Sequence, residues 1–323
     1  MCTAISFNSE SHYFGRTLDL EYSYNENVII TPRNFKFKFR KTKNLNSHFA
    51  IIGIGISEED FPLYYDAINE KGLCMAGLNF PQNAMYFPSK CDKENLAPFE
   101  LIPFILGSFE SVDQVKNALK TINIANIHFN KKFENTPLHW LVCDREKSIV
   151  IEQTKSGLDV FDNEIGVLTN SPNFTAQLQN LSNYSALSNT YKKPFFSREI
   201  DLSPYSNGLG AVGLPGDFSS MSRFVKATFV KLNSTCKDDE NASISQFFHV
   251  LQSVEMPRGS VKIGRKFEKT VYTSCYNSRE QILYYKTYEN NQINAVDMKK
   301  ENLNSKSLII FKLNTEQNIN FQN

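Results

Sequence analysis

A cysteine directly after the initiator methionine is the residue in this 323-residue sequence with the clearest chemical potential. Removal of Met1, which is usual before a small residue, would leave Cys2 with both a thiol and a free α-amino group. The thiolate is a nucleophile, and an α-amine has an ordinary pKa of about 7.7–8.0, so it can take up a proton near neutral pH. One residue could therefore supply both nucleophile and base, directly or through a water molecule. The alternative is a small residue at a frayed terminus.

Two charged residues follow Cys2 at a spacing that a β-hairpin would fold back onto it. The apolar run Thr3–Phe7 predicts a buried strand, and a second β-like segment, Tyr13–Leu18, follows a polar turn. The guanidinium of Arg16 would favour the thiolate, and the carboxylate of Asp19 would orient the ammonium. A surface ion pair at a hairpin end is the alternative, and such a pair contributes little.

Composition and charge narrow the classes of function. Lys and Arg number 35 against 34 Asp and Glu, which argues against nucleic acid or a membrane surface as a general partner. The sequence has no zinc spacing among its six cysteines and no Walker or dinucleotide motif, so no metal or organic cofactor is predicted. It has no signal peptide, bilayer-spanning stretch or interdomain linker. We therefore expect a cytoplasmic protein with reduced cysteines, no membrane insertion and one domain over residues 1–323.

Hydrophobic periodicity outlines the elements that must position these residues. Phe35, Phe37 and Phe39 alternate with basic residues, which predicts a half-buried strand within 28–40. Helices are predicted at Pro98–Phe109, Ser111–Ile122 and Ile244–Val254, and further strands within 50–80 (three strands) and at Leu138–Cys143, Ile149–Gln153, Leu158–Phe161, Gly166–Thr169, Thr270–Cys275, Ile282–Thr287, Ile293–Asp297 and Ser307–Lys312. Strand runs joined by short turns, with helices in clusters, predict an α+β fold with antiparallel sheets.

Four more polar residues stand at the boundaries of these elements. Asn79 closes a strand before a proline, and Asn170 follows the strand at 166–169, from which its amide could face a developing oxyanion. By spacing alone, both are ordinary cap or turn residues. Ser222 is the predicted N-cap of a helix that would place Arg223 in its first turn. The helix dipole disfavours a cation there, which hints at a specific partner for Arg223.

Taken together, these motifs resemble one enzyme family. Met1–Ile5 and the Tyr-Phe-Gly-Arg-x-Leu-Asp motif at 13–19 resemble the choloylglycine hydrolase family, the N-terminal nucleophile hydrolases that include conjugated bile salt hydrolases and penicillin V acylases. Gly77–Pro81 and the Leu-Thr-Asn-x-Pro-x-Phe motif at 168–174 extend the resemblance, which runs to about Lys312. The resemblance implies a four-layer αββα sandwich with two antiparallel sheets. It also implies an amidohydrolase that cleaves glycine- or taurine-conjugated bile salts without a cofactor.

The resemblance also implies roles for individual residues. Cys2 would attack the amide carbonyl, with its α-amino group as base and then as acid to the leaving amine. The backbone N–H of Asn79 and the side chain of Asn170 would hold the oxyanion. The charge state of the thiol and the amine would be set by Arg16, Asp19 and Arg223.

Other implications of the resemblance concern the substrate and the assembly. Leu20, Phe61 and Phe133 are positional guesses for the surface that holds the steroid. The long irregular segment at 185–217 resembles the family's extended loop that reaches a neighbouring subunit, which implies a homotetramer.

Two alternatives to a bile salt hydrolase stay open at this point. Penicillin V acylase, or a related N-acyl amidase, would share every catalytic residue named. Asn79 favours bile salts, because penicillin V acylases often carry tyrosine at that position. A non-catalytic binding protein on the same fold is the alternative from a different class.

Overall fold

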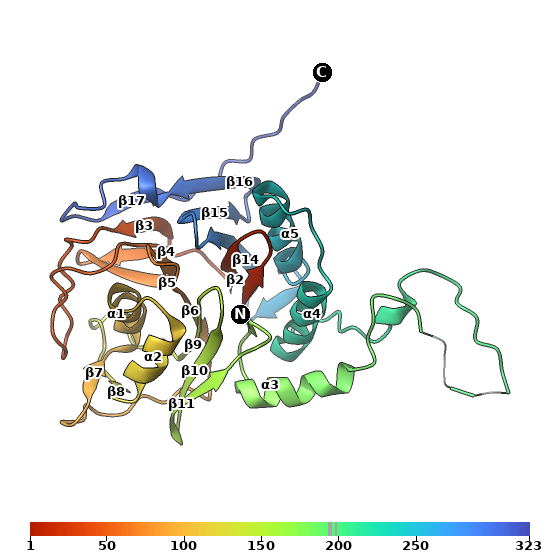
Figure 1. Cartoon of the computed structure of the whole chain (residues 1–323), viewed down its shortest axis with the longest axis horizontal. Coiled ribbons are helices and arrows are strands. Elements are labelled where there is room, and N and C mark those ends of the chain that lie inside the picture. The colour runs from red at the N-terminus through yellow and green to blue at the C-terminus, as the bar shows by residue number, and fades with distance from the viewer. Residues whose placement is uncertain (193–195, 198) are drawn as a thin grey trace.

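Two large antiparallel sheets form the centre of the molecule, with helices on the outer side of each. The computed structural model describes residues 1–192, 196–197 and 199–323. Figure 1 shows α1 and α2 on the outer side of one sheet and α4 and α5 on the outer side of the other. The predicted α+β class, with a helix–sheet–sheet–helix order of layers, is therefore confirmed.

The first sheet places the N-terminal strand between two segments that are distant from each other in the sequence. Its order among the described residues is β12-β1-β2-β14-β15-β16, with β13 paired to β14. Its strands are β1 (Cys2–Asn8), β2 (His12–Leu20), β12 (Val167–Leu168), β13 (Val261–Ile263), β14 (Lys266–Asn277), β15 (Ile282–Thr287) and β16 (Asn290–Asp297). The predicted hairpin is β1–β2. Because β1 also pairs with β12, the start of the chain lies beside the segment that leads into Asn170.

The second sheet is built from apolar strands rich in isoleucine, leucine and valine. Its order among the described residues is β11-β10-β9-β6-β5-β4-β3-β17. Its strands are β3 (Asn27–Thr31), β4 (Ile51–Glu58), β5 (Phe61–Asn69), β6 (Cys74–Asn79), β9 (Leu138–Cys143), β10 (Ser148–Thr154), β11 (Gly157–Asp162) and β17 (Ile309–Lys312). Two short strands, β7 (Glu94–Leu96) and β8 (Ile122–Ile124), pair in parallel outside this sheet.

Four of the described α-helices, α2 to α5, begin at a polar residue whose side chain caps the helix. The α-helices are α1 (Leu101–Ser108), α2 (Val112–Leu119), α3 (Phe174–Leu181), α4 (Ser220–Leu232) and α5 (Glu240–Gln252), with short 3₁₀ turns at Pro98–Glu100, Ser182–Tyr184, Leu209–Ala211 and Met298–Lys300. Ser111 caps α2 by accepting a hydrogen bond from the N–H of Gln114. The expected cap of α4 was wrong, because Ser219 rather than Ser222 accepts the capping bond. The helix starts earlier than predicted, and Arg223 is its fourth residue, at the end of the first turn.

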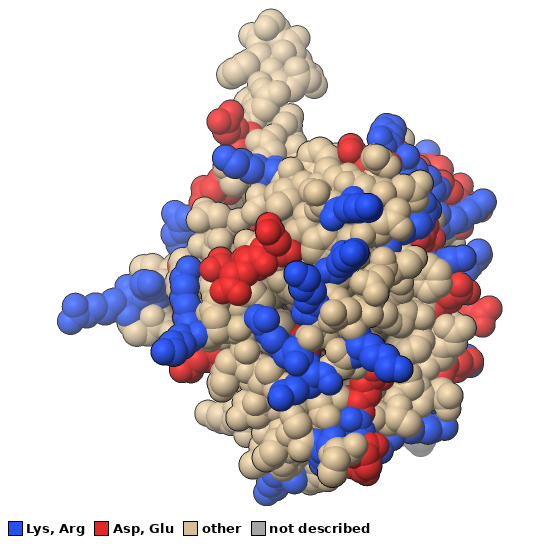
Figure 2. Space-filling view, turned by 90° about the vertical axis from the view of Figure 1, so that its left-hand side faces the viewer, with Lys and Arg blue, Asp and Glu red and all other residues tan. Residues whose placement is uncertain are grey.

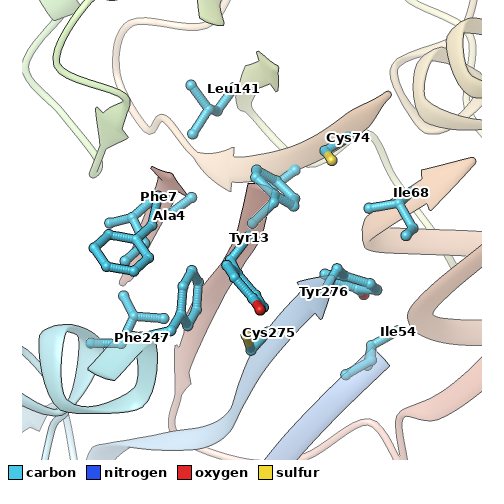
Figure 3. Close-up of a cluster of buried hydrophobic side chains, with 14 of the residues drawn as sticks. Ala4, Phe7, Tyr13, Ile54, Ile68, Cys74, Leu141, Phe247, Cys275 and Tyr276 are labelled. Atoms are coloured by element: carbon cyan, nitrogen blue, oxygen red, sulfur yellow. The ribbon is translucent and has the colours of Figure 1, made fainter. Parts of the chain in front are cut away.

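Side chains alternate between two cores because neighbouring residues of a strand point to opposite faces. In β9, Leu141 and Cys143 belong to the core between the sheets, whereas Trp140 and Val142 belong to the core beneath α1 and α2. The first of these cores continues to the outer side of the first sheet, where α4 and α5 pack. Figure 3 shows part of it, in which Phe7 of β1 meets Phe247 of α5, with ring centroids 6.3 Å apart. Burying an aromatic or aliphatic side chain of this size contributes roughly 1.5–3 kcal/mol, so both sheets are held firmly against their helices.

The strand predicted within 28–40 forms only in its first part, because β3 ends at Thr31. Residues 35–40 keep the expected alternation, with three buried phenylalanines and exposed basic residues, but they do not join a sheet. Their backbone N–H groups do not form a continuous strand ladder: that of Phe35 donates to the carbonyl of Pro32 at 3.0 Å, and that of Phe37 pairs with Leu45 in one isolated bridge. Phe39 donates to Oδ1 of Asn44 at 3.2 Å, and Arg40 donates to Oε1 of Glu100 at 2.6 Å. Of the predicted range 28–40, residues 28–31 therefore form a strand as part of β3, whereas 35–40 keep the predicted burial pattern without forming one.

The exposed side of this segment contributes to a mixed charged surface. Lys36, Lys38 and Arg40 are exposed. Figure 2 views the molecule from the side on which residues 32–50 lie in Figure 1, and it shows basic side chains interspersed with acidic ones and with uncharged surface. Such interspersed charge is typical of a solvated protein face.

The predicted long loop projects from the molecule, whereas the N-terminus lies near its centre. Residues 185–217 extend away from the sandwich, although 193–195 and 198 fall outside the described residues (Figure 1). The N-terminus instead lies among the central elements (Figure 1). Within the described ranges, none of the helices has the length and apolar character needed to cross a bilayer.

Candidate active site

Cys2 lies at the buried start of β1, and its side chain is only 3% exposed. In the β1–β2 hairpin, Cys2 stands opposite Leu18 and Ala4 stands opposite Arg16. Residues two apart on a strand share a face, and so do residues directly opposite each other. The side chains of Cys2 and Arg16 therefore project from the same face of the first sheet.

Arg16 is a buried cation whose guanidinium is held by backbone carbonyls. Nη1 donates to the carbonyl of Gly77 at 2.6 Å and to that of Tyr65 at 3.3 Å, and Nε donates to the carbonyl of Thr17 at 3.1 Å. Burial alone would lower the pKa of Arg16, but the nearby Cys2 thiol and other acidic groups raise it above its ordinary value. A permanent positive charge thus lies beside the thiol.

Arg16 reaches this position because β2 approaches β14 very closely just before it. A β-carbon on Gly15 would overlap the backbone carbonyl oxygen of Ser274, so only glycine fits there. The backbone N–H of Arg16 donates to Oγ of Ser274 at 3.1 Å. The glycine in the Tyr-Phe-Gly-Arg motif therefore has a packing role that sets the position of the arginine.

Asn170 connects the N-terminal strand to two other elements through its side-chain amide. Oδ1 accepts from the backbone N–H of Cys2 at 2.7 Å and from Nη2 of Arg223 at 2.8 Å. Nδ2 donates to the carbonyl of Asn79, at the end of β6, at 2.7 Å. A carboxamide carries two N–H donors, so a second one is left for another acceptor.

Arg223 holds the same strand from the side of α4. Its Nη1 donates to the carbonyl of Cys2 at 2.5 Å and to Oγ1 of Thr3 at 2.6 Å, while Nε donates to the carbonyl of Phe218 at 3.0 Å. Burial lowers the pKa of Arg223, and the nearby acidic groups, Asp19 foremost, oppose that change. The specific partner that the sequence hinted at is therefore the backbone of residue 2 together with Asn170.

A buried histidine and glutamate fix the backbone on either side of Asn170. His139 lies against the carbonyl of Thr169 through Nε2 at 2.8 Å and against Oε1 of Glu152 through Nδ1 at 3.1 Å. The same carboxylate oxygen accepts from the N–H of Phe174 at 2.9 Å. Neither His139 nor Glu152 is among the residues that line the cavity described below, so this pair supports the backbone around Asn170.

Asp19 meets the N-terminus through its backbone and not through its carboxylate. Its carbonyl accepts from the terminal nitrogen of Met1 at 2.6 Å. Its carboxylate accepts from the hydroxyls of Thr17 at 3.1 Å and Thr270 at 2.6 Å. The Asp19 carboxylate was expected to orient the ammonium directly. In the unprocessed chain it does not contact the ammonium.

Glu268, which sequence reasoning missed, is the carboxylate that contacts the terminal ammonium. It forms an ion pair with the nitrogen of Met1 and is itself 1% exposed. It lies on β14, which pairs with β2 beside Asp19. No local motif marks it, because its partner is at the other end of the sequence.

A cavity of about 830 Å³ extends from Cys2 towards α1 and the 129–136 segment. Asn79, Leu20 and Phe133 line it, as do Arg16 and Gly77. Its walls are mostly apolar side chains and backbone, including Leu18, Ile56, Leu63, Tyr65, Phe99, Ile102, Phe129 and Trp140.

Phe61 is not among the residues that line this cavity. Its ring packs behind two aromatic side chains that do, with centroids 5.7 Å from Phe99 and 6.1 Å from Phe129. As the first residue of β5, it faces the core beneath α1. Phe61 was expected to contact the steroid directly. In the structure it instead supports the aromatic side chains that line the cavity.

The described residues contain no group of three or more His, Cys, Asp and Glu side chains placed to hold a metal ion. The functional groups that line the end of the cavity are instead the Cys2 thiol, the Arg16 guanidinium and Asn79, with Asn170 and Arg223 bonded to the backbone of Cys2. A thiol at the end of an apolar cavity, with amide N–H donors nearby, is an arrangement that can attack a carbonyl and hold the resulting oxyanion. The absence of a cofactor stays a prediction.

Comparison with known proteins places this chain among the linear amide C–N hydrolases. The matching family model is described as "Linear amide C-N hydrolases, choloylglycine hydrolase family", and it covers residues 2–311. The chain therefore belongs to the choloylglycine hydrolase family, which confirms the resemblance seen in the sequence motifs.

Individual relatives agree with this assignment. The chain is 52% identical over 317 residues to a bile salt hydrolase/transferase of Lactiplantibacillus plantarum, covering 98% of each chain. It is 42% identical over 329 residues to a bile salt hydrolase/transferase of Clostridium perfringens, covering 100% of each.

Among solved structures, the C2A mutant of the conjugated bile acid hydrolase from Clostridium perfringens matches with a TM-score of 0.92, at 42% identity and full coverage of both chains. The penicillin V acylase from Agrobacterium tumefaciens matches with a TM-score of 0.75 at 17% identity, covering 96% of this chain and 90% of that one, and so shares the fold.

The hydrogen bonds of Asn170 lead to a stability prediction. In Asn170→Ala, the N–H of Cys2 and the guanidinium of Arg223 would lose a shared buried acceptor. We expect the free energy of unfolding to fall by about 1–3 kcal/mol, measured by urea denaturation. The control is Asn207→Ala, because Asn207 is exposed in the long loop, and it should change stability by less than about 0.5 kcal/mol. Equal stabilities of the two variants would contradict the bridging role of Asn170.

Proposed function

We propose that this protein hydrolyses the amide bond of glycine- or taurine-conjugated bile salts, with Cys2 as an N-terminal nucleophile. The observation that carries the proposal is the position of Cys2, which lies at the end of an apolar cavity beside Arg16 and is held by Asn170 and Arg223. The names of full-length relatives at 52% and 42% identity support the substrate class.

The proposed reaction divides amide hydrolysis into two acyl transfers. The thiolate of Cys2 adds to the amide carbonyl, and the oxyanion receives hydrogen bonds from the backbone N–H of Asn79 and from Nδ2 of Asn170. The C–N bond then breaks as the α-ammonium of Cys2 gives its proton to the leaving glycine or taurine nitrogen. Water next attacks the thioester, the C–S bond breaks, and the free bile acid leaves as the thiol is restored.

This mechanism requires removal of Met1. In the unprocessed chain the nitrogen of Cys2 is a peptide N–H that donates to Asn170, and a peptide nitrogen cannot accept a proton near neutral pH. After removal of Met1, the same nitrogen is an amine one bond from the α-carbon that carries the thiol side chain. Nucleophile and base are then held by one buried residue.

The cavity suits a substrate with a rigid apolar body and one amide near its end. Phe133, Leu20 and the aromatic rings of Phe99 and Phe129 supply an apolar surface along it. A volume of about 830 Å³ lies within the range of small-molecule sites, which is roughly 300–1,000 Å³. We propose that the steroid lies along this surface with its amide at Cys2.

Penicillin V acylase activity is the second candidate. The structure with that name shares the fold at 17% identity, and the cavity end would suit any amide with an apolar acyl group. Asn79 favours bile salts through the family resemblance described above. A non-catalytic binding protein would require that Met1 be retained or that Cys2 be inert.

We further propose that the chain acts as one domain within a homotetramer assembled through the 185–217 loop. The described part of this loop exposes large apolar side chains, with Tyr205 87% exposed, Phe196 82% and Val212 70%. Apolar groups this exposed on an extended loop are typical of a protein–protein contact. The cytoplasmic location stays a prediction, which cell fractionation would test.

Replacement of Cys2 tests the proposed activity. We expect Cys2→Ala to abolish release of glycine and taurine from glycocholate and taurocholate, measured by ninhydrin, because it removes the nucleophile while keeping the α-amine. Penicillin V, assayed in parallel with the wild-type protein, should be cleaved at least about tenfold less efficiently in kcat/KM.

The matched control is Cys91→Ala, which removes an exposed cysteine and should keep wild-type activity. Intact mass should show that active wild-type protein lacks Met1. Turnover by Cys2→Ala, or full activity with Met1 retained, would refute the proposal. Faster cleavage of penicillin V than of either bile salt would favour the second candidate.

The oligomeric state is tested by changing the loop. Tyr205→Asp places a charge on the exposed apolar surface, and we expect it to shift the particle from about four chains towards one or two in sedimentation velocity. Asn207→Asp, a neighbouring exposed position that adds the same charge, is the control and should leave the tetramer intact. A monomeric wild-type protein would contradict this part of the proposal.

A further inference from the structure

A buried carboxylate beside the N-terminal nitrogen takes no part in the mechanism described so far. Glu268 is 1% exposed and pairs through Oε1 with the terminal nitrogen of Met1. Its second oxygen, Oε2, is buried and has no hydrogen-bond partner within the described residues. A buried carboxylate is costly unless it is paired, and a buried polar atom without a partner calls for a specific explanation.

The other carboxylate near the N-terminus is already engaged. Both carboxylate oxygens of Asp19 accept hydrogen bonds from threonine hydroxyls, one from Thr17 and one from Thr270. Asp19 offers the terminal amine only its backbone carbonyl. Among the described residues, Glu268 is thus the carboxylate in direct contact with the terminal ammonium, and it has an oxygen to spare.

We propose that Glu268 is a positioning residue that holds the α-ammonium of processed Cys2 and favours its protonated form. This inference rests on the proposed function, in which that amine is the base. Removal of Met1 moves the amine one residue along β1, roughly 3.4 Å, which keeps it within direct or single-water reach of the carboxylate. Asn170 already accepts one N–H of that nitrogen at 2.7 Å, and an ammonium adds two more donors for Glu268 and the carbonyl of Asp19.

The charges around this amine determine the direction of the expected effect. Arg16 and Asp19 face it from β2, Arg223 from α4 and Glu268 from β14, beside the Cys2 thiol on β1. Burial raises the pKa of Glu268, and the terminal ammonium opposes that rise, so the two groups stabilise each other's charges. Loss of this carboxylate should leave the guanidinium groups dominant and favour the free amine.

The test is the pH dependence of Glu268→Gln beside a matched control. The rising limb of kcat/KM for glycocholate reports formation of the free amine, and its midpoint should fall by about one pH unit in Glu268→Gln. The control is Glu255→Gln, because Glu255 contacts Thr273 of the same strand and Lys286 but lies outside the site. It should keep the wild-type midpoint. An unchanged midpoint in Glu268→Gln, or an equal shift in the control, would overturn the proposal.

A second measurement separates this inference from the proposed function. The α-amine of protein labelled with ¹⁵N-cysteine can be titrated by NMR without any substrate, and its midpoint should fall in Glu268→Gln as in the kinetic assay. If no bile salt is cleaved but this midpoint falls, the proposed function fails and the role of Glu268 stands. If bile salts are cleaved and the midpoint is unchanged, the role of Glu268 fails alone.

A conservative variant covers the case in which Glu268→Gln does not fold. Glu268→Asp keeps the negative charge but moves it away from the amine by the length of one methylene group. Its midpoint should fall by a smaller amount, on the order of a few tenths of a pH unit, with kcat reduced. A wild-type midpoint together with wild-type kcat in Glu268→Asp would overturn the proposal.

Discussion

The hydrogen bonds that meet at the carboxamide of Asn170 are the constraint on which the rest of the site depends. Its oxygen is shared by the N–H of Cys2 and the guanidinium of Arg223, and its nitrogen donates to the carbonyl of Asn79. Hydrogen bonds with a charged donor contribute about 1.5–3 kcal/mol, and here they join one strand from each sheet to a helix. The first residues of the chain, which would otherwise fray, are thereby fixed at the end of a cavity.

The second feature of the site is the buried positive charge around Cys2. Arg16 and Arg223 are both about 1% exposed, and their donors go mainly to backbone carbonyls rather than to carboxylates. Two guanidinium groups placed this way create a positive field at the thiol without neutralising it in direct ion pairs. Burying two guanidinium groups costs desolvation free energy and so lowers the stability of the fold. Active sites commonly combine such lower stability with function.

The sequence motifs predicted which of the candidate site residues the fold brings together wherever those residues are linked by local structure. The hairpin that carries Cys2 and Arg16 follows from two short apolar segments and a polar turn, and Asn170 follows from the strand end that precedes it. Glu268 could not be found this way, because its contact spans nearly the whole chain and its local sequence is an ordinary strand. The strand expected within 28–40 ends at Thr31, because the N–H groups at 35–40 bond to a turn carbonyl, to one isolated bridge partner and to side chains instead of to a continuous neighbouring strand.

The central claim is that the processed N-terminal cysteine is acylated during turnover. Rapid acid quench of the wild-type protein with glycocholate, followed by tryptic mass mapping, tests it most directly. We predict the bile acyl group on the peptide Cys2–Arg16, with its new N-terminus at the cysteine. An acyl group on any other peptide, or a peptide from active protein that still begins with Met1, would contradict the account.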